Sequence, residues 1–220
     1  MHAGQVSKIK GYTQLQDLLA CKVDRPEFRE QFYKLYGIHP DMALPDLHEQ
    51  IYRFLTDLQF GLPVHLARKE LRKCSATVQE AVTEFIARLT NTQSFRVNVG
   101  NPFPGPNYQK AQHCVDLIYI YDSFAEALRA VDEELPADVI KNQALVDSFQ
   151  EDWIRFIADP IDAAEDGRAT NYNADRTTSV VDVDLDEKWS ERRVRYEFLN
   201  TFSLSSQQAM EALSGDGHSF

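Results

Sequence analysis

The chain has 220 residues, of which 43% are hydrophobic and 11% aromatic, so it can form an ordinary domain with a sizeable core. Its formal net charge of −11 argues against nucleic acid and anionic membrane surfaces as partners, because both repel an acidic protein. The three cysteines are widely spaced and form no C-x-x-C pair. The N-terminus shows no apolar signal-peptide core, so we expect a cytoplasmic protein with reduced thiols.

Amphipathic helices are the dominant pattern along the chain. Asp24 is the expected N-cap of the first clear helix, Pro26 lies in its first turn, and Gly37 ends it. The stretch from Phe60 to Pro63 is expected to break the following helix, and Ser75 is expected to cap a later one. Apolar spacing predicts a short helix or loop at 13–20 and helices at 26–36, 44–58, 64–72, 75–89, 115–131, 138–157 and 186–199, followed by a weakly helical tail.

Strand patterns are few and lie far apart in the sequence. One is expected at 94–99, and two more, at 167–173 and 177–184, are joined by a turn. A stiff loop with three prolines follows the first strand at 100–112. We expect so few strands not to pair easily into a self-contained sheet, which indicates a piece of a larger sheet protein. The predicted fold class is α/β, dominated by helix.

Four segments resemble the C-terminal part of the type-B carboxylesterases, the α/β-hydrolase family that includes cholinesterases, and they look closest to its fungal members. The most specific is Gly100 to Pro106 followed by His113 to Tyr119, which resembles the His-x-x-acidic-Leu-x-Tyr signature of the family. The others are Leu55 to Pro63, Phe149 to Phe156, and Val181 to Leu199. The resemblance implies the C-terminal portion of an α/β-hydrolase fold over residues 25–200, with a poorly matched segment at 1–24 and a tail at 201–220.

Residue by residue, the resemblance places only His113, at the position of the catalytic base that takes the proton from a serine hydroxyl. The chain has no Gly-x-Ser-x-Gly elbow to supply that serine. Where the family has its triad acid, the run from Gly4 to Gly11 offers Ile9 or Lys10. We therefore expect an incomplete serine hydrolase, inactive on its own, that acts on a small-molecule ester once completed and needs no cofactor or metal.

Several other residues have simpler readings. Cys114 is more readily a small buried hydrophobe than a substitute nucleophile, and Asp116 suits the positive end of a helix dipole. The alternating acids of 182–187 lack the glycine and closing glutamate of a calcium loop, so we expect a solvated strand face. The alternative function is a non-catalytic chain that docks on another hydrolase-fold chain through the unpaired strand 94–99.

Overall fold

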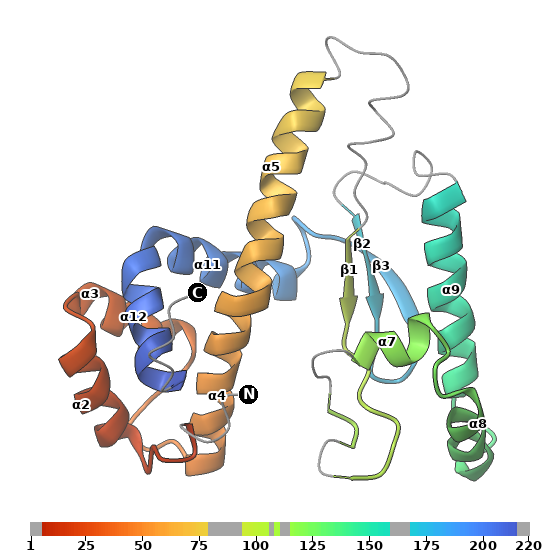
Figure 1. Ribbon diagram of the computed structural model, residues 1–220, viewed down its shortest axis with the longest axis horizontal. Helices are drawn as coiled ribbons and strands as arrows, with labels where there is room; N and C mark the ends of the chain where they lie inside the picture. Colours follow the sequence, from red (N-terminus) through yellow and green to blue (C-terminus); the bar gives the residue numbers. More distant parts are fainter. Residues whose placement is uncertain (1–5, 79–93, 106–107, 111–114, 159–167, 215–220) are drawn as a thin grey trace. The chain divides into compact units, whose positions relative to one another are not determined.

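The computed structural model describes residues 6–78, 94–105, 108–110, 115–158 and 168–214 (Figure 1). The chain divides into two compact units. The first unit combines residues 1–69 with 191–220, and the second comprises residues 70–190. Helix dominates the described residues, and their strands form one small mixed sheet. This agrees with the α/β class at the coarse level.

The first unit is helical in its described part. The segment expected to be a short helix or loop is a full helix, α2, and the tail expected to be weakly helical forms α12, with Ala209 and Leu213 in the core. The helices that lie wholly or partly in this unit are α2 (Tyr12–Lys22), α3 (Pro26–Leu35), α4 (Leu44–Thr56), the π-helix η1 (Asp57–Gly61), α5 (Leu62–Val78), α11 (Glu187–Thr201) and α12 (Ser203–Ser214).

Aromatic side chains fill the core of the first unit. Phe28 and Phe32 lie one turn apart on α3, and both are completely buried. Phe32 meets Phe54 of α4 edge to face at 5.0 Å, and Phe28 stacks on Phe198 of α11 at 5.1 Å. Such ring pairs add about 0.5–1.5 kcal/mol each beyond the area they bury. The helical spacing of Phe28 and Phe32 in the sequence therefore identified this core correctly.

Helix ends account for two corrections. The residue before α3 is Arg25 rather than Asp24, and no side chain caps the helix there. Gly37 does end the helix as expected, with a φ of 62°, a conformation that costs glycine little. Ser75 lies inside α5 rather than at the start of a new helix, and the rest of the helix expected at 75–89 lies outside the described residues from 79 onward.

The predicted break at Phe60 to Pro63 is wrong. The chain continues from α4 through η1 into α5, where Pro63 is the second residue. A proline ring inside a regular α-helix clashes with the carbonyl four residues earlier and removes a hydrogen bond. The wider π turn just before Pro63 changes that spacing, so the helix can take the proline without ending.

The sheet of the second unit corrects the expectation that the strands cannot pair. Its order is β1 (Ser94–Val97), β2 (Arg168–Tyr172), β3 (Thr178–Asp182). β1 pairs with β2 in parallel, with Phe95 opposite Thr170, and β2 pairs with β3 as an antiparallel hairpin. Strand 94–97 is thus paired along one edge, whereas no described strand pairs with the other edge.

Among the described residues, three helices lie wholly in this unit, and α11 begins in it. The single helix predicted at 115–131 is two helices, α7 (Val115–Ile120) and α8 (Ala125–Glu134), because Asp122 takes a left-handed φ of 48° between them. The predicted helix at 138–157 is α9 (Asn142–Ala158), which packs on α7 and α8 (Figure 1). Asp186 directly precedes α11, and its carboxylate accepts a hydrogen bond from the Trp189 amide.

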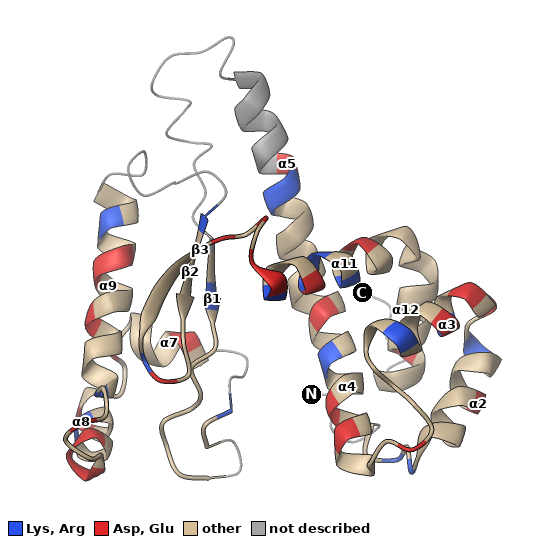
Figure 2. Ribbon diagram, turned by 180° about the vertical axis from the view of Figure 1, so that it is seen from behind, with Lys and Arg blue, Asp and Glu red and all other residues tan. Residues whose placement is uncertain are grey.

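The acidic run after β3 is not a strand face. β3 ends at Asp182, and the next residues form a turn in which the Asp184 amide donates to the Asp182 carboxylate. The resulting acidic segment between β3 and α11 is visible in Figure 2. Asp and Asn side chains favour such local turns because they bond their own backbone two residues on. That preference is stronger here than the alternation of apolar and acidic residues.

Candidate functional site

His113, the predicted catalytic base, lies outside the described residues, as does Cys114. The chain on both sides of them is described. Lys110 precedes this gap, and Val115, the first residue of α7, follows it. The candidate site is therefore built from the two flanks, which together define where the segment 111–114 begins and ends.

The flank before His113 starts at the end of β1. Val99 is 2% exposed, and the Asn98 amide extends the sheet by donating to the Tyr172 carbonyl at 2.9 Å. Asn101 then closes the loop: its amide donates to the Lys110 carbonyl at 3.1 Å, and its carbonyl accepts from the Gln109 amide at 2.8 Å. These bonds join the beginning and end of the proline-rich loop. Asn101 is thus held to the described residues Gln109 and Lys110 by two backbone hydrogen bonds.

Gly100 permits an unusually close approach at the base of this loop. A Cβ atom placed on Gly100 would lie 2.2 Å from the backbone carbon of Gln109, closer than real Cβ contacts. Gln109 itself has a φ of 57°, which is uncommon for a residue other than glycine. Backbone strain of this kind concentrates at functional sites, where the surrounding structure holds it in place. The strained residue lies four positions before His113.

The flank after His113 is the short helix α7. It has only six residues, too few to be stable without tertiary contacts. Val115 and Tyr119, four residues apart, are its buried positions, at 3% and 0% exposure. The Tyr119 hydroxyl donates a hydrogen bond to the Gly100 carbonyl at 3.0 Å. Burial raises the pKa of Tyr119 to about 12, so its hydroxyl keeps its proton at neutral pH.

A stack of rings supports Tyr119 from behind. Its ring lies parallel to that of Phe149 on α9, at 6.1 Å, and Phe149 stacks on Tyr172 of β2 at 3.6 Å. Tyr172 is also fixed by its hydroxyl, which donates to the Asp152 carboxylate at 2.7 Å. Burial and this carboxylate both raise the pKa of Tyr172. Helix α9 thus connects the sheet to α7 through aromatic contacts.

Among the described residues, the contacts around Gly100 and Tyr119 include no activated nucleophile. Asp116, half-buried in the first turn of α7, suits the helix dipole, as its sequence position indicated. Ile9, one of two residues at the expected position of the triad acid, is a core residue of the first unit. Among the described residues, no cluster of three His, Cys, Asp or Glu side chains is arranged to hold a metal ion.

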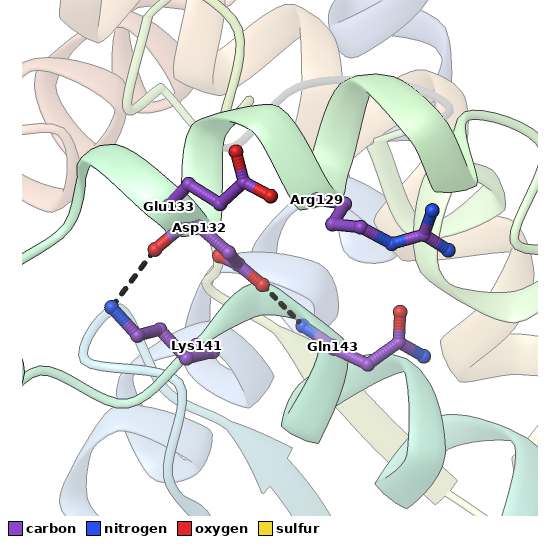
Figure 3. Close-up of a pocket in the computed structure, with 5 residues that line it drawn as sticks. All are labelled: Arg129, Asp132, Glu133, Lys141 and Gln143. Carbon is purple, nitrogen blue, oxygen red and sulfur yellow. Dashed lines mark hydrogen bonds between the residues drawn. The ribbon is translucent and has the colours of Figure 1, made fainter.

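A pocket of ≈ 420 Å³ lies elsewhere in the second unit, between α8 and α9 (Figure 3). The Asp132 carboxylate accepts hydrogen bonds from the Asn142 and Gln143 amides at 2.8 and 3.0 Å, so it caps the start of α9. The Lys141 ammonium donates to three carbonyls at the end of α8 and just beyond, including that of Asp132. The Asp132 carboxylate and the Lys141 ammonium both bind backbone groups at helix ends. We therefore interpret the pocket as a junction between two helices rather than as a reactive site.

Sequence reasoning missed two polar clusters in the first unit. In one, the Arg195 guanidinium donates to the Asp57 carboxylate at 2.7 Å, and the Tyr36 hydroxyl donates to the same carboxylate oxygen at 3.2 Å. In the other, Glu197 accepts from Lys69 at 2.9 Å and lies 3.1 Å from the His65 ring. The sequence separations exceed 100 residues for all these pairs but Tyr36–Asp57, so no local pattern could reveal them.

Comparisons with family models, with curated proteins and with solved structures find no match for this chain. No helix within the described ranges has both the length and the apolar character needed to cross a lipid bilayer. The interpretation of the site therefore depends on the residues of the chain and on their geometry.

Proposed function

We propose that this chain is a carboxylesterase-like protein that corresponds to the C-terminal portion of an α/β-hydrolase, with His113 as the general base. The observation that supports this most is the order of strand, closed loop and helix around the segment 111–114. β1 runs parallel to β2, its loop closes on itself at Asn101, and α7 is bonded back to Gly100. The described residues on both sides of this segment are thus held by hydrogen bonds, an arrangement that suits a neighbouring proton-transfer residue.

In the reaction proposed, the serine comes from a part of the hydrolase fold that these 220 residues do not contain. His113 removes the proton from the serine hydroxyl as it attacks the ester carbonyl, and then returns a proton to the departing alcohol. Water, activated by the same imidazole, then releases the acid from the acyl-enzyme. No metal or organic cofactor takes part in this scheme.

The purified chain should show no esterase activity, because a neutral imidazole without an activated nucleophile and oxyanion hole gives little catalysis. The measurement is release of nitrophenol from short-chain nitrophenyl esters, compared with a buffer blank. Turnover that disappears in His113→Ala would contradict the expected inactivity and would mean that the chain holds a complete site.

Complementation tests the role of His113 itself. The chain is refolded with the N-terminal part of a type-B carboxylesterase that carries the Gly-x-Ser-x-Gly elbow, and ester hydrolysis is measured. We expect activity that His113→Ala lowers by at least about 10²-fold, the usual contribution of a general base. The exposed His39 gives the matched control, and His39→Ala should leave the rate unchanged. Equal loss in both variants would refute the assignment.

A second candidate function is docking on another hydrolase-fold chain, favoured by the edge of β1 that pairs with no described strand. The Asn98 amide bonds to β2, so the alternation along the strand directs the Val97 amide to the other edge. Phe95, 37% exposed, adds apolar surface on this strand. Such an edge fits an added strand from a partner.

The variant Val97→Pro tests this docking. It removes the Val97 amide, which faces the free edge, and leaves the amides that bond to β2 in place. Sedimentation of the chain with the N-terminal part of the carboxylesterase should show a complex that Val97→Pro weakens. The change Val180→Ser on β3, at a residue 62% exposed, is the control and should not affect association. Equal association of all three chains would rule out this edge as the docking surface.

A further inference from the structure

The last turns of α9 carry an exposed apolar surface next to the edge strand β1. Ile154 and Ile157 are 65% and 73% exposed. They flank Trp153, whose ring meets the ring of Phe95 on β1 at 6.0 Å, edge to face. Phe95 is itself 37% exposed. These four residues form the β1–α9 surface, and a contiguous exposed apolar surface of this kind commonly marks an interaction site.

The contacts of α9 show on which side of the helix this surface lies. Trp153 faces β1 through Phe95, and the neighbouring Asp152 faces β2, where its carboxylate accepts a hydrogen bond from Tyr172. Successive residues of an α-helix are rotated by about 100°, so Ile154 lies on the opposite side of Trp153 from Asp152. Ile157, about 40° from Trp153, lies on that same side. The exposed isoleucines therefore point away from β2, past the edge of β1.

We propose that the β1–α9 surface docks a strand–helix unit of another hydrolase-fold chain, whose strand pairs with β1 and whose helix packs on Ile154 and Ile157. This inference rests on the docking function proposed above and names the part of the partner that docks. Strands paired in parallel, as β1 is with β2, usually belong to sheets covered by helices. A strand added beside β1 therefore brings a helix of its own, and the exposed isoleucines mark the face on which that helix lies.

The spacing of the layers fits this occupant. Neighbouring strands lie about 4.8 Å apart and packed helices about 10 Å apart, so one helix covers about two strands. α9 covers β1 and β2, because Trp153 meets Phe95 and Phe149 stacks on Tyr172. The next helix of the layer would lie over the strands added beyond β1. It would then contact α9 on the side of Ile154 and Ile157.

The chemistry of the surface argues against two other occupants. A partner strand alone would bond to the edge of β1 and leave both isoleucines in water. A second copy would bring together two chains that each carry a net charge of −11, and like charges oppose association. Arg155, beside the isoleucines on α9, is already paired with Glu151 and Asp152. The partner helix is therefore expected to present aliphatic side chains to this surface.

Two charged variants, Ile154→Glu and Ile157→Glu, test the helix contact. Each places a carboxylate where the partner helix would pack, and both sites are exposed enough for the chain to fold, which circular dichroism checks. Leu204→Glu on α12 is the matched control, since it makes the same change at an aliphatic residue 69% exposed in the other unit. Sedimentation of the 220-residue chain with the N-terminal part of a type-B carboxylesterase gives the dissociation constant of each complex.

We expect Ile154→Glu and Ile157→Glu each to weaken the complex at least about 10-fold, as the loss of a buried interface contact does, and Leu204→Glu to leave it unchanged. Parent-like binding by both isoleucine variants would overturn the proposal, and so would an equal loss in Leu204→Glu. A dimer of the chain alone that Ile157→Glu disrupts would also overturn it, because the occupant would then be a second copy.

The variant Val97→Pro separates this inference from the docking function on which it rests. If Val97→Pro weakens the complex and the isoleucine variants do not, the partner docks through a strand alone and only the helix contact is rejected. If the isoleucine variants weaken it and Val97→Pro does not, the contact lies on α9 alone and the strand–helix unit is rejected. If the parent chain forms no complex, both the docking function and the helix contact are rejected.

Discussion

At the scale of single residues, burial determines which charges matter. The side chains of Asp57 and Arg195 are 9% and 12% exposed, and they meet at 2.7 Å. Burial opposes the charge on Arg195, but the adjacent carboxylate outweighs it, so the pKa of the guanidinium is raised. Burial, with the same carboxylate, also raises the pKa of Tyr36. Removing one member of such a group leaves the other charged and enclosed.

Asp57→Ala should therefore lower the free energy of unfolding by about 3–5 kcal/mol, the cost of an unpaired buried charge. The pair of Arg53 and Glu49 on α4 is exposed, at 48% and 67%, and gives the control. Glu49→Gln should change stability by no more than about 0.5 kcal/mol. Urea unfolding followed by circular dichroism measures both. A loss in Asp57→Ala as small as that in Glu49→Gln would mean that Arg195 finds water or another partner.

At the scale of elements, the helix ends of α8 and α9 stabilise one another. Asp132, in the last turn of α8, caps α9, and Lys141, just before α9, supplies donors to the carbonyls at the end of α8. Each helix thus satisfies orphan groups of the other across the link 135–141. Arg176 from the β2–β3 hairpin adds a bond to the Asn142 side chain at 2.8 Å, which ties the hairpin to the same junction.

Asp132→Ala should lower the free energy of unfolding by about 2 kcal/mol, because it removes a cap with charged hydrogen bonds and leaves the buried Asn142 without them. Glu134→Ala is the matched change two residues on, at an exposed side chain, and should be nearly neutral. Thermal unfolding and amide exchange of Asn142 and Gln143 measure the effect. Unaltered protection of those two amides would contradict the capping role.

At the scale of the whole molecule, each of the two units has its own hydrophobic core. Tyrosines contribute to both cores: Tyr33 packs against the first and Tyr119 lies within the second. Burial raises the pKa of each to about 12. In the unfolded chain a tyrosine ionises near 10, so between about pH 10 and 12 the folded chain holds protons that the unfolded chain has lost.

The sign of this linkage predicts alkaline unfolding. The stability contributed by the neutral tyrosines is fully present below about pH 10 and falls as the pH rises toward 12. Urea unfolding midpoints from pH 8 to 12, with tyrosinate absorbance near 295 nm, measure it. Tyr119→Phe should make the second unit lose less stability over this range. If the absorbance showed that all tyrosines of the folded chain ionise by about pH 10, the prediction would be contradicted.

The amino-acid sequence by itself determined much of the local structure. Periodic apolar residues such as Phe28 and Phe32, or Phe149 on α9, identified helices and their buried faces, because a repeat of about 3.6 residues is a local property. The strand near 94–99, the hairpin at 168–182 and the end of α3 at Gly37 were also predicted from local sequence patterns. His113 was proposed from its motif alone, and its placement stays a prediction.

Only the tertiary structure decided how these pieces meet. The parallel pairing of β1 with β2 joins residues more than 70 positions apart, and the bond of Asp57 to Arg195 spans 138. The continuous helix through Pro63 and the left-handed break at Asp122 depend on a π turn and a backbone strain that composition does not encode. The bond from Tyr119 to Gly100 is likewise set by packing: the sequence indicated an aromatic residue on α7, but only the stack on Phe149 directs its hydroxyl to the loop that leads to His113.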